Sequence, residues 1–185
     1  MERPRLTTRR LLLSPPALGD AAAVINLAND PLIAEFTLSV PYPYTEADLV
    51  GWLQAVETGW NDGTALVFAI RDPATEEFMG AAGLHLHPRY GHAELGFWMG
   101  RPFRGRGYVR EAVAALIDYG FEQLPIQRIH ANHRADNEAS GRVLLASGLV
   151  REALLEQFFI KEGQAWDVVQ YRLLRREWER ATGTN

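Results

Sequence analysis

The segment RPFRGRGYVREA, residues 101–112, constrains the chain more than any other stretch, with two glycines and four arginines between a predicted strand and a predicted helix. A helix that begins after such a turn leaves its first backbone N–H groups without intrahelical partners. These donors and the positive helix end together form an anion site. Gly105 and Gly107 permit close approach and positive φ, and Arg104 and Arg106 add fork-shaped donors. We therefore expect this turn to bind a pyrophosphate.

Two other phosphate-binding motifs fit the turn poorly. A Walker loop needs Lys followed by Ser or Thr after its last glycine, whereas Tyr108 and Val109 follow here. A dinucleotide fingerprint needs a third glycine where Arg110 stands, and a parallel doubly wound sheet that the predicted hairpins oppose. A glycine-rich loop with solvated arginines and no ligand remains the simplest alternative from this stretch alone.

The order of predicted elements indicates one α/β domain, residues 1–185, around a mixed and mostly antiparallel sheet. Asp20 is a candidate N-cap, Thr45 and Asp48 form a capping-box pattern, and Gly148 is suited to end a helix. The periodicity predicts helices over 20–30, 45–60, 108–121 and 136–148. It predicts strands within 9–16, 65–72, 78–87, 92–100, 127–134, 154–160 and 166–174. Gly96 inside a strand indicates a bulge or a close approach by another group.

Composition excludes several classes of protein. The chain has 185 residues, 47% of them apolar, which is enough for one domain with a core. It has no cysteine, so disulfides, thiolate metal sites and a cysteine nucleophile are absent. The net charge of −4 argues against a general nucleic-acid binder, and no segment has the length and hydrophobicity of a membrane helix. We expect a soluble cytoplasmic protein.

The glycine-rich turn and its neighbours resemble one family in particular. RGRGYV has the spacing R-x-x-G-x-[G/A], with Arg104 and Gly107 in register and Val109 in place of the usual small residue. TTRRLLLSPP followed by Asp20, AELGFWM, GRGYVREA and NEASGRVLLASGL occur in the expected order. This set resembles the GNAT N-acetyltransferases, in the branch of the Rim-type ribosomal-protein N-terminal acetyltransferases. The resemblance implies the GNAT fold, α+β or α/β, with a sheet of six to seven strands splayed at its centre and about four flanking helices.

The same resemblance implies acetyl-CoA as the acyl donor and a primary amine as the acceptor. The strand over 92–100 would line the pantetheine arm through backbone groups, and Asn137 would donate or accept a hydrogen bond on that arm. The turn after the strand would hold the diphosphate. The implied cofactor-binding residues are Phe97, Trp98, Met99, Arg104, Gly105, Arg106, Gly107, Tyr108, Val109 and Asn137. Taken locally, Asn137 is also a good N-cap for the helix that it opens.

Three residues are candidates for the chemistry. The resemblance places the Ser140 hydroxyl near the thioester sulfur, and Leu144 replaces the tyrosine that many relatives use as the acid. Glu94 and Glu152 both match positions of acidic residues near the acceptor, and we favour Glu152 slightly on register. Either carboxylate could act through water, because an α-amine with a pKa of about 8 needs only modest help. Asp167 and Tyr171 would shape the site.

Other features are weaker or remain open. His85 with His87, and His130 with His133, lack a third ligand at a suitable spacing, so we expect no metal. An aromatic acceptor pocket is expected from Phe36, Tyr42, Tyr44 and Phe158. The alternatives to an enzyme of this kind are a CoA-binding module without turnover and an enzyme that binds ATP with Mg²⁺. A homodimer, with no nucleic-acid or membrane partner, is a further expectation.

Overall fold

The computed structural model describes residues 3–184. Within this range, the strands form one eight-stranded sheet. The strand order is β1-β2-β3-β4-β5-β6-β8-β7, and within the described part β5–β6 is the one parallel pair. The strands are β1 (Leu6–Thr7), β2 (Leu12–Ser14), β3 (Ala65–Arg71), β4 (Phe78–His87), β5 (His92–Met99), β6 (Arg128–Arg134), β7 (Val150–Lys161) and β8 (Gln164–Leu174). The mixed, mostly antiparallel sheet is confirmed, with one more strand than predicted because β1 is only two residues long.

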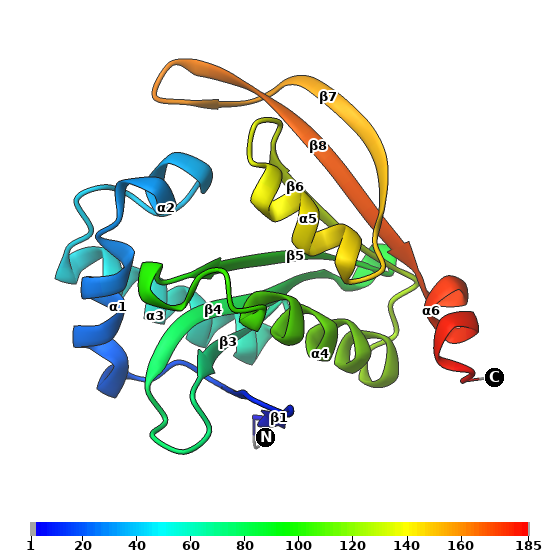
Figure 1. The fold of residues 1–185 in the computed structure, drawn as a ribbon, viewed down its shortest axis with the longest axis horizontal. Helices are drawn as coiled ribbons and strands as arrows, with labels where there is room; N and C mark the ends of the chain where they lie inside the picture. The colour runs from blue at the N-terminus through cyan, green and yellow to red at the C-terminus, as the bar shows by residue number, and fades with distance from the viewer. Residues whose placement is uncertain (1–2, 185) are drawn as a thin grey trace.

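Helices cover both faces of this sheet (Figure 1). They are α1 (Ala21–Ala28), α2 (Pro31–Phe36), α3 (Glu46–Asp62), α4 (Tyr108–Gln123), α5 (Glu138–Ala146) and α6 (Arg175–Thr182). The count exceeds the four predicted helices. Pro31 does end α1, but it also occupies the first turn of α2, where Asp30 accepts a hydrogen bond from the Leu32 N–H at 3.0 Å. The other addition, α6, buries only Trp178 among its residues and so has no apolar periodicity to detect.

The capping residues predicted from the sequence cap their helices at some ends and not at others. Thr45 and Asp48 form the predicted capping box at the start of α3, and Gly148 has φ +89 after α5. Asp20 precedes α1 as predicted, but its side chain does not cap the helix. The Asp20 carboxylate instead accepts two hydrogen bonds from Arg71 on β3, at 2.6 and 2.7 Å. Asp20 therefore anchors the start of α1 to the sheet.

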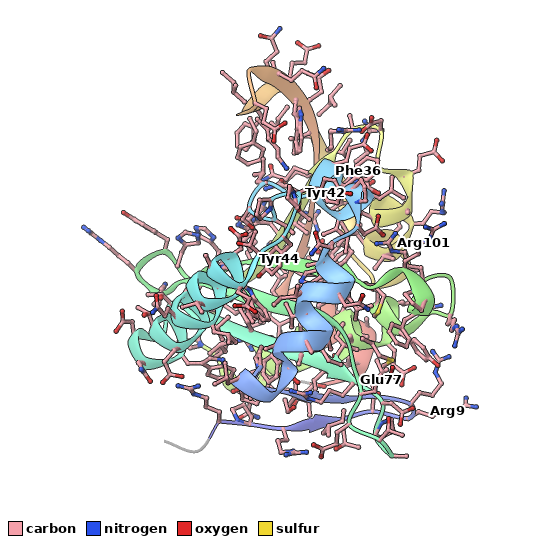
Figure 2. All side chains as sticks on the ribbon, turned by 90° about the vertical axis from the view of Figure 1, so that its left-hand side faces the viewer. Arg9, Phe36, Tyr42, Tyr44, Glu77 and Arg101 are labelled. Atoms are coloured by element: carbon pink, nitrogen blue, oxygen red, sulfur yellow. The ribbon has the colours of Figure 1, made fainter. Side chains whose placement is uncertain are left out.

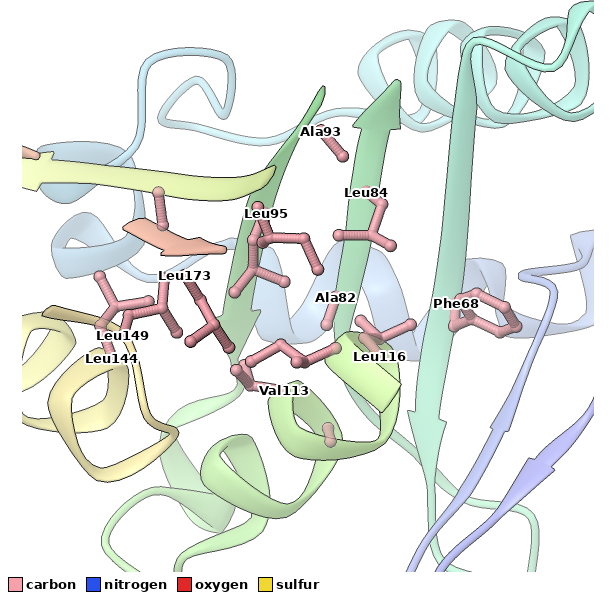
Figure 3. Close-up of a cluster of buried hydrophobic side chains, with 14 of the residues drawn as sticks. Phe68, Ala82, Leu84, Ala93, Leu95, Val113, Leu116, Leu144, Leu149 and Leu173 are labelled. Atoms are coloured by element: carbon pink, nitrogen blue, oxygen red, sulfur yellow. The ribbon is translucent and has the colours of Figure 1, made fainter. Parts of the chain in front are cut away.

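The main hydrophobic core lies between the sheet and α4 (Figure 3). Val113, Leu116 and Ile117 recur at helical spacing on one face of α4 and are almost completely buried. They meet Phe68, Leu84 and Leu95 from three neighbouring strands. A second cluster joins α1 and α3 to the opposite face of the sheet. The two layers fix the position of β5 from both sides.

The sheet opens between β5 and β6, as predicted. The two strands pair only from His92 to Glu94, opposite Arg128 to His130. Beyond that point β5 continues along β4 to Met99, while β6 continues along β8, so the carboxyl-terminal halves of the two strands separate (Figure 1). The fold thus places a gap beside the second half of β5.

Gly96 does not mark a bulge, which corrects one of the two interpretations of this residue. Its strand pairs with β4 in an unbroken register, with Gly96 opposite Gly83. A Cβ atom added to Gly96 would have no neighbour within 4 Å. The residue therefore keeps an open surface beside the gap, in line with the second interpretation, a close approach by another group.

Candidate active site

The glycine-rich turn presents a set of unpaired backbone donors. Gly105 and Gly107 have φ of +75 and +77, and Gly107 precedes α4 without a side-chain cap. Within residues 3–184, no N–H group of residues 105–110 donates a hydrogen bond to the protein, and the first turn closes with Glu111 N–H to the Gly107 carbonyl at 3.1 Å. Consecutive free donors at a helix N-terminus are suited to a phosphate group.

The turn between β1 and β2 packs against the glycine-rich turn and forms hydrogen bonds with it and with the start of α4. The Glu111 carboxylate accepts hydrogen bonds from the Thr8 hydroxyl at 2.7 Å and from the Arg10 N–H at 2.8 Å. Burial disfavours the charged form of Glu111, but these hydrogen bonds outweigh it and hold its pKa below the ordinary value. Arg10 also donates to the Arg106 carbonyl at 3.0 Å and lies over the Tyr108 ring. The backbone of the turn is therefore fixed before any ligand arrives.

The two arginines of the turn occupy different surroundings. The Arg104 guanidinium donates to the Met99 carbonyl at 2.9 Å and lies 2.8 Å from the carboxylate of Asp30. It therefore connects the turn to the start of α2. Arg106 stays exposed at the surface of the turn. Val109 is half-buried and packs against the main core, so its side chain faces away from the free donors.

A cavity of about 840 Å³ lies along the gap and continues toward α1, α2 and α3. Leu95, Gly96, Phe97 and Trp98 line it from β5, and Ser140 and Leu144 line it from α5. On the side of α3 it is bounded by Asp48 and several aromatic rings. The Phe, Tyr and Trp residues of the wall are Phe36, Tyr44, Trp52, Phe97, Trp98, Phe159 and Trp166.

The cavity has the expected aromatic lining, but only some of the predicted residues contribute to it. Figure 2, which looks onto α1, shows Phe36, Tyr42 and Tyr44 on the same side of the molecule. Phe36 and Tyr44 line the cavity, whereas Tyr42 is exposed outside it. Phe158 is also exposed, and its neighbour Phe159 lines the wall instead. Burial and the nearby Asp48 carboxylate raise the pKa of Tyr44 to about 12, so its hydroxyl stays protonated.

The structure separates the two carboxylates that the sequence left as alternatives. Glu94 lines the cavity and accepts a hydrogen bond from the Asn132 side chain at 3.2 Å. Glu152 lies outside the cavity lining and forms a two-pronged ion pair with Arg128, one hydrogen bond of which measures 2.9 Å. That pairing lowers the pKa of Glu152. Glu94 is thus the carboxylate that can meet a substrate in the cavity.

The first turn of α5 forms the opposite wall. The Asn137 side-chain oxygen accepts a hydrogen bond from the Ser140 N–H at 3.2 Å, which is the N-cap geometry expected from its position. Ser140 itself lines the cavity. A Cβ atom on Gly141 would lie 3.0 Å from both His133 Nε2 and the Tyr171 hydroxyl, so α5 packs closely on β6 and β8. Tyr171 therefore helps to set the width of the gap.

Two positively charged side chains, Arg134 and Lys161, hold α2 in place beside the cavity. The Arg134 guanidinium lies between the rings of Phe36 and Trp166, at 4.5 and 5.2 Å, and forms ion pairs with Glu35 and Asp136. Lys161, from the β7–β8 hairpin, donates to the carbonyl of Thr37 at 2.7 Å and also to that of Ala34. The hairpin thereby holds the carboxyl end of α2, where Phe36 and Thr37 line the cavity.

From the resemblance to the GNAT enzymes, we expect Lys161→Met to raise the KM for the acceptor by roughly three- to tenfold and to leave acetyl-CoA affinity unchanged. The substitution keeps the length of the side chain but removes the charged donor from two carbonyls, a loss of about 1.5–3 kcal/mol of local interaction. Initial rates at varied acceptor and calorimetric titration with acetyl-CoA measure the two effects. Arg5→Met, which removes an exposed ion pair with Glu76, is the matched control. Equal changes in both variants would contradict the role of Lys161.

Comparison with known proteins identifies the class that this fold and site define. Residues 10–150 match the family model described as the Acetyltransferase (GNAT) domain, and the chain belongs to this family. The chain is 31% identical to N-acetyltransferase p20 of Bacillus licheniformis over 94% of its own length and 97% of that protein. It is 29% identical to the [ribosomal protein uS5]-alanine N-acetyltransferase of Escherichia coli, with 69% of each chain covered.

Solved structures agree with the family assignment. A structure described as the ribosomal L7/L12 α-N-protein acetyltransferase RimL, in complex with coenzyme A, superposes with a TM-score of 0.83. The match is 20% identical and covers 90% of this chain and 95% of that one. Together the comparisons make this chain an acetyl-CoA-dependent N-acetyltransferase. Among residues 3–184 no helix is long and apolar enough to cross a membrane, and no group of three or more potential ligands could hold a metal ion.

Proposed function

We propose that this enzyme acetylates the primary amine at the N-terminus of a protein by direct attack on acetyl-CoA. The observation that carries the proposal is the cavity, which has Glu94 on one wall and Ser140 on another. A base and an acid on different walls of one cavity are what amide formation from a thioester requires. Residues 1–185 act as one domain in this proposal.

The free donors of residues 105–110 suit the diphosphate, and the open surface at Gly96 suits the pantetheine arm. Phe97 and Trp98 line the same path. Met99 ends β5 with its side chain in the main core, so it would contribute backbone groups alone, and Asn137 is the N-cap of α5. This arrangement directs the thioester toward Ser140 and Glu94. Hydrogen-bond donors and a fitting channel hold the donor substrate in one position, which lowers the entropic cost of the reaction.

The chemistry then needs two proton transfers. Glu94 takes a proton from the ammonium group, directly or through one water, and the neutral amine attacks the carbonyl carbon. A C–N bond forms and the C–S bond breaks. The nitrogen of the adduct then loses its second proton, which passes to the departing thiolate through the Ser140 hydroxyl, so serine is regenerated and free thiol leaves. No covalent enzyme intermediate is involved.

The acceptor side of the cavity favours a cationic substrate. It carries the carboxylates of Glu94 and Asp48. Among the described residues that line it, Arg134 alone has a guanidinium, and this group is already paired with Glu35 and Asp136. The name of the Escherichia coli relative specifies an alanine N-terminus of a ribosomal protein. We therefore propose a protein N-terminus with a small first residue as the acceptor.

Release of free thiol from acetyl-CoA tests this proposal directly, because the protein has no cysteine and contributes no background. A peptide with N-terminal alanine, its N-acetylated form, spermidine and lysine are supplied in parallel. We expect release with the free peptide and none with the blocked one. Tight acetyl-CoA binding without acceptor-dependent release in the whole panel would leave a binding module as the better description.

We further propose that the enzyme works in the cytoplasm, without nucleic-acid or membrane partners, as a homodimer. The absence of cysteine and the net charge of −4 support the first two points. The edge strand β7 exposes the apolar side chains of Leu154, Phe158 and Ile160, which supports pairing of two copies there. Sedimentation at several protein concentrations measures the oligomeric state.

A further inference from the structure

Four of the five histidines of the chain surround Glu94 on one face of the sheet. His85 on β4 and His130 on β6 are the cross-strand neighbours of Glu94 on β5. One step along the strands, His87 is paired with His92 in the same way. Because cross-strand neighbours share a face, these side chains form one continuous group. We call His130, His92 and His87 the histidine row.

Side-chain contacts connect the row from the interior to the surface. His130 Nε2 lies 3.3 Å from His92 Nδ1, within hydrogen-bond reach. The rings of His92 and His87 are stacked with centroids 4.5 Å apart. His130 and His92 are half-buried, whereas His87 is exposed. The row therefore begins beside the carboxylate of the cavity and ends in solvent.

The protonation states of the row permit proton transfer. Burial is the main cause that lowers the pKa of both His130 and His92, and it therefore favours the neutral imidazole in each. Glu94 opposes this shift at both histidines, while Arg128 adds to it. A neutral imidazole accepts a proton at one nitrogen and donates from the other.

One buried ring nitrogen of the histidine row makes no hydrogen bond to the described part of the chain. His130 Nδ1 is buried and, within residues 3–184, has no hydrogen-bond partner. His130 Nε2 meets His92, so Nδ1 is the atom that remains to receive a proton. The charged groups that face this region from the other elements are Arg128 on β6, paired with Glu152 on β7, and Arg172 on β8, paired with Glu177.

We propose that the histidine row carries the proton that Glu94 removes from the acceptor amine to bulk solvent. This inference rests on the proposed function of Glu94 as the base. No protein group among the described residues lies within hydrogen-bond reach of His130 Nδ1, so one water passes the proton from Glu94 to that nitrogen. The Nε2 proton of His130 moves to His92 Nδ1, and His92 releases its other proton to water beside the exposed His87 ring. The path matters because substrates that fill the cavity separate Glu94 from solvent. His130, His92 and His87 act as positioning residues, since they work through Glu94.

Acetylation rates of His130→Gln and His92→Gln with the N-terminal-alanine peptide test the path. We expect kcat to fall about tenfold at pH 7, a modest share of a general-base contribution, with unchanged acetyl-CoA affinity. At pH 9 the deficit should disappear, because an amine with a pKa of about 8 is then already neutral. Added imidazole should restore the rate at pH 7. A deficit equal at both pH values and insensitive to imidazole would overturn the proposal.

A double variant, His130→Gln with Glu94→Gln, tests the proton path separately from the proposed function of Glu94 as the base. If the row acts through Glu94, His130→Gln should cause no further loss in the Glu94→Gln background. A large loss in Glu94→Gln with none in His130→Gln would reject the path alone. Full activity of Glu94→Gln would reject the base itself, and no turnover by the native enzyme with any amine would reject the proposed function.

Histidine titration followed by NMR tests the coupling without an acceptor. Glu94→Gln should lower the pKa of His130, since the carboxylate raises it in the native protein. His92→Gln should raise it, because loss of a like-charged neighbour favours protonation. Unchanged titration of His130 in both variants would show that the row is not coupled to the cavity, and the proposal would then fail.

Discussion

Glu94→Gln should lower kcat/KM for the peptide acceptor by about 10²–10³-fold at pH 7, the range expected when a general base is removed. The side chain keeps its size and can still interact with Asn132, so the cavity should retain its shape. Acetyl-CoA affinity, measured by calorimetry, should not change. The activity should recover partly above pH 8, where a fraction of the amine is neutral in solution. Initial rates from thiol release between pH 6 and 9 give the comparison.

Glu152→Gln is the matched control for this substitution, since it makes the same chemical change at the carboxylate outside the cavity. The sequence slightly favoured Glu152, but its ion pair with Arg128 holds it away from the cavity lining. We expect less than a twofold change in kcat/KM and a stability change of about 0–1 kcal/mol, as for a partly exposed pair. The reverse ranking of the two variants would overturn the assignment of Glu94.

Asp20→Asn should lower the free energy of unfolding by about 3–5 kcal/mol, because it leaves the Arg71 guanidinium buried without its counter-charge. Both side chains of this ion pair are only 9% exposed, and their oxygen and nitrogen atoms meet at 2.6 Å. Arg71 also donates to the Ser14 hydroxyl at 2.8 Å. The pair ties α1 to β3, and α1 contributes Val24 and Ala28 to the cavity wall.

Urea denaturation of the native protein and of the variant measures this loss. Glu76→Gln provides the control, because Glu76 pairs with Arg5 where both side chains are more than half exposed. That substitution should cost no more than about 1 kcal/mol. Equal and small losses in the two variants would mean that the buried ion pair contributes little to the attachment of α1.

The features that the sequence predicted well are those with a local cause. Gly105 and Gly107 have a positive φ, and the pattern of their neighbours places both in the turn that leads into α4. The capping box of Thr45 and Asp48 is complete within four residues. The parting of β5 and β6 was expected only through the family resemblance, because it depends on which strands pair at a distance.

The features that the sequence missed depend on distant partners. Asp20 looked like a cap, but its partner Arg71 is 51 residues away in the chain. Glu152 and Glu94 were indistinguishable until the position of Arg128 was known. On β7, each of the two alternating sets of side chains contains both apolar and charged residues, so no pattern decides that Phe159 faces the cavity and Phe158 faces outward. Trp52 and Trp166 also line the cavity, and only the tertiary packing of their elements places them there.

The backbone donors at the start of α4 are the central feature of the proposed acetyl-CoA site, and the amide resonances of residues 105–110 report on them directly. In titrations followed by ¹⁵N–¹H correlation spectra, acetyl-CoA should shift these amides strongly downfield. Acetyl-pantetheine, which lacks the diphosphate, should leave them unmoved while both ligands perturb Gly96 and Phe97. Saturation with acetyl-CoA that leaves residues 105–110 unperturbed would contradict the assignment of this turn as the diphosphate site.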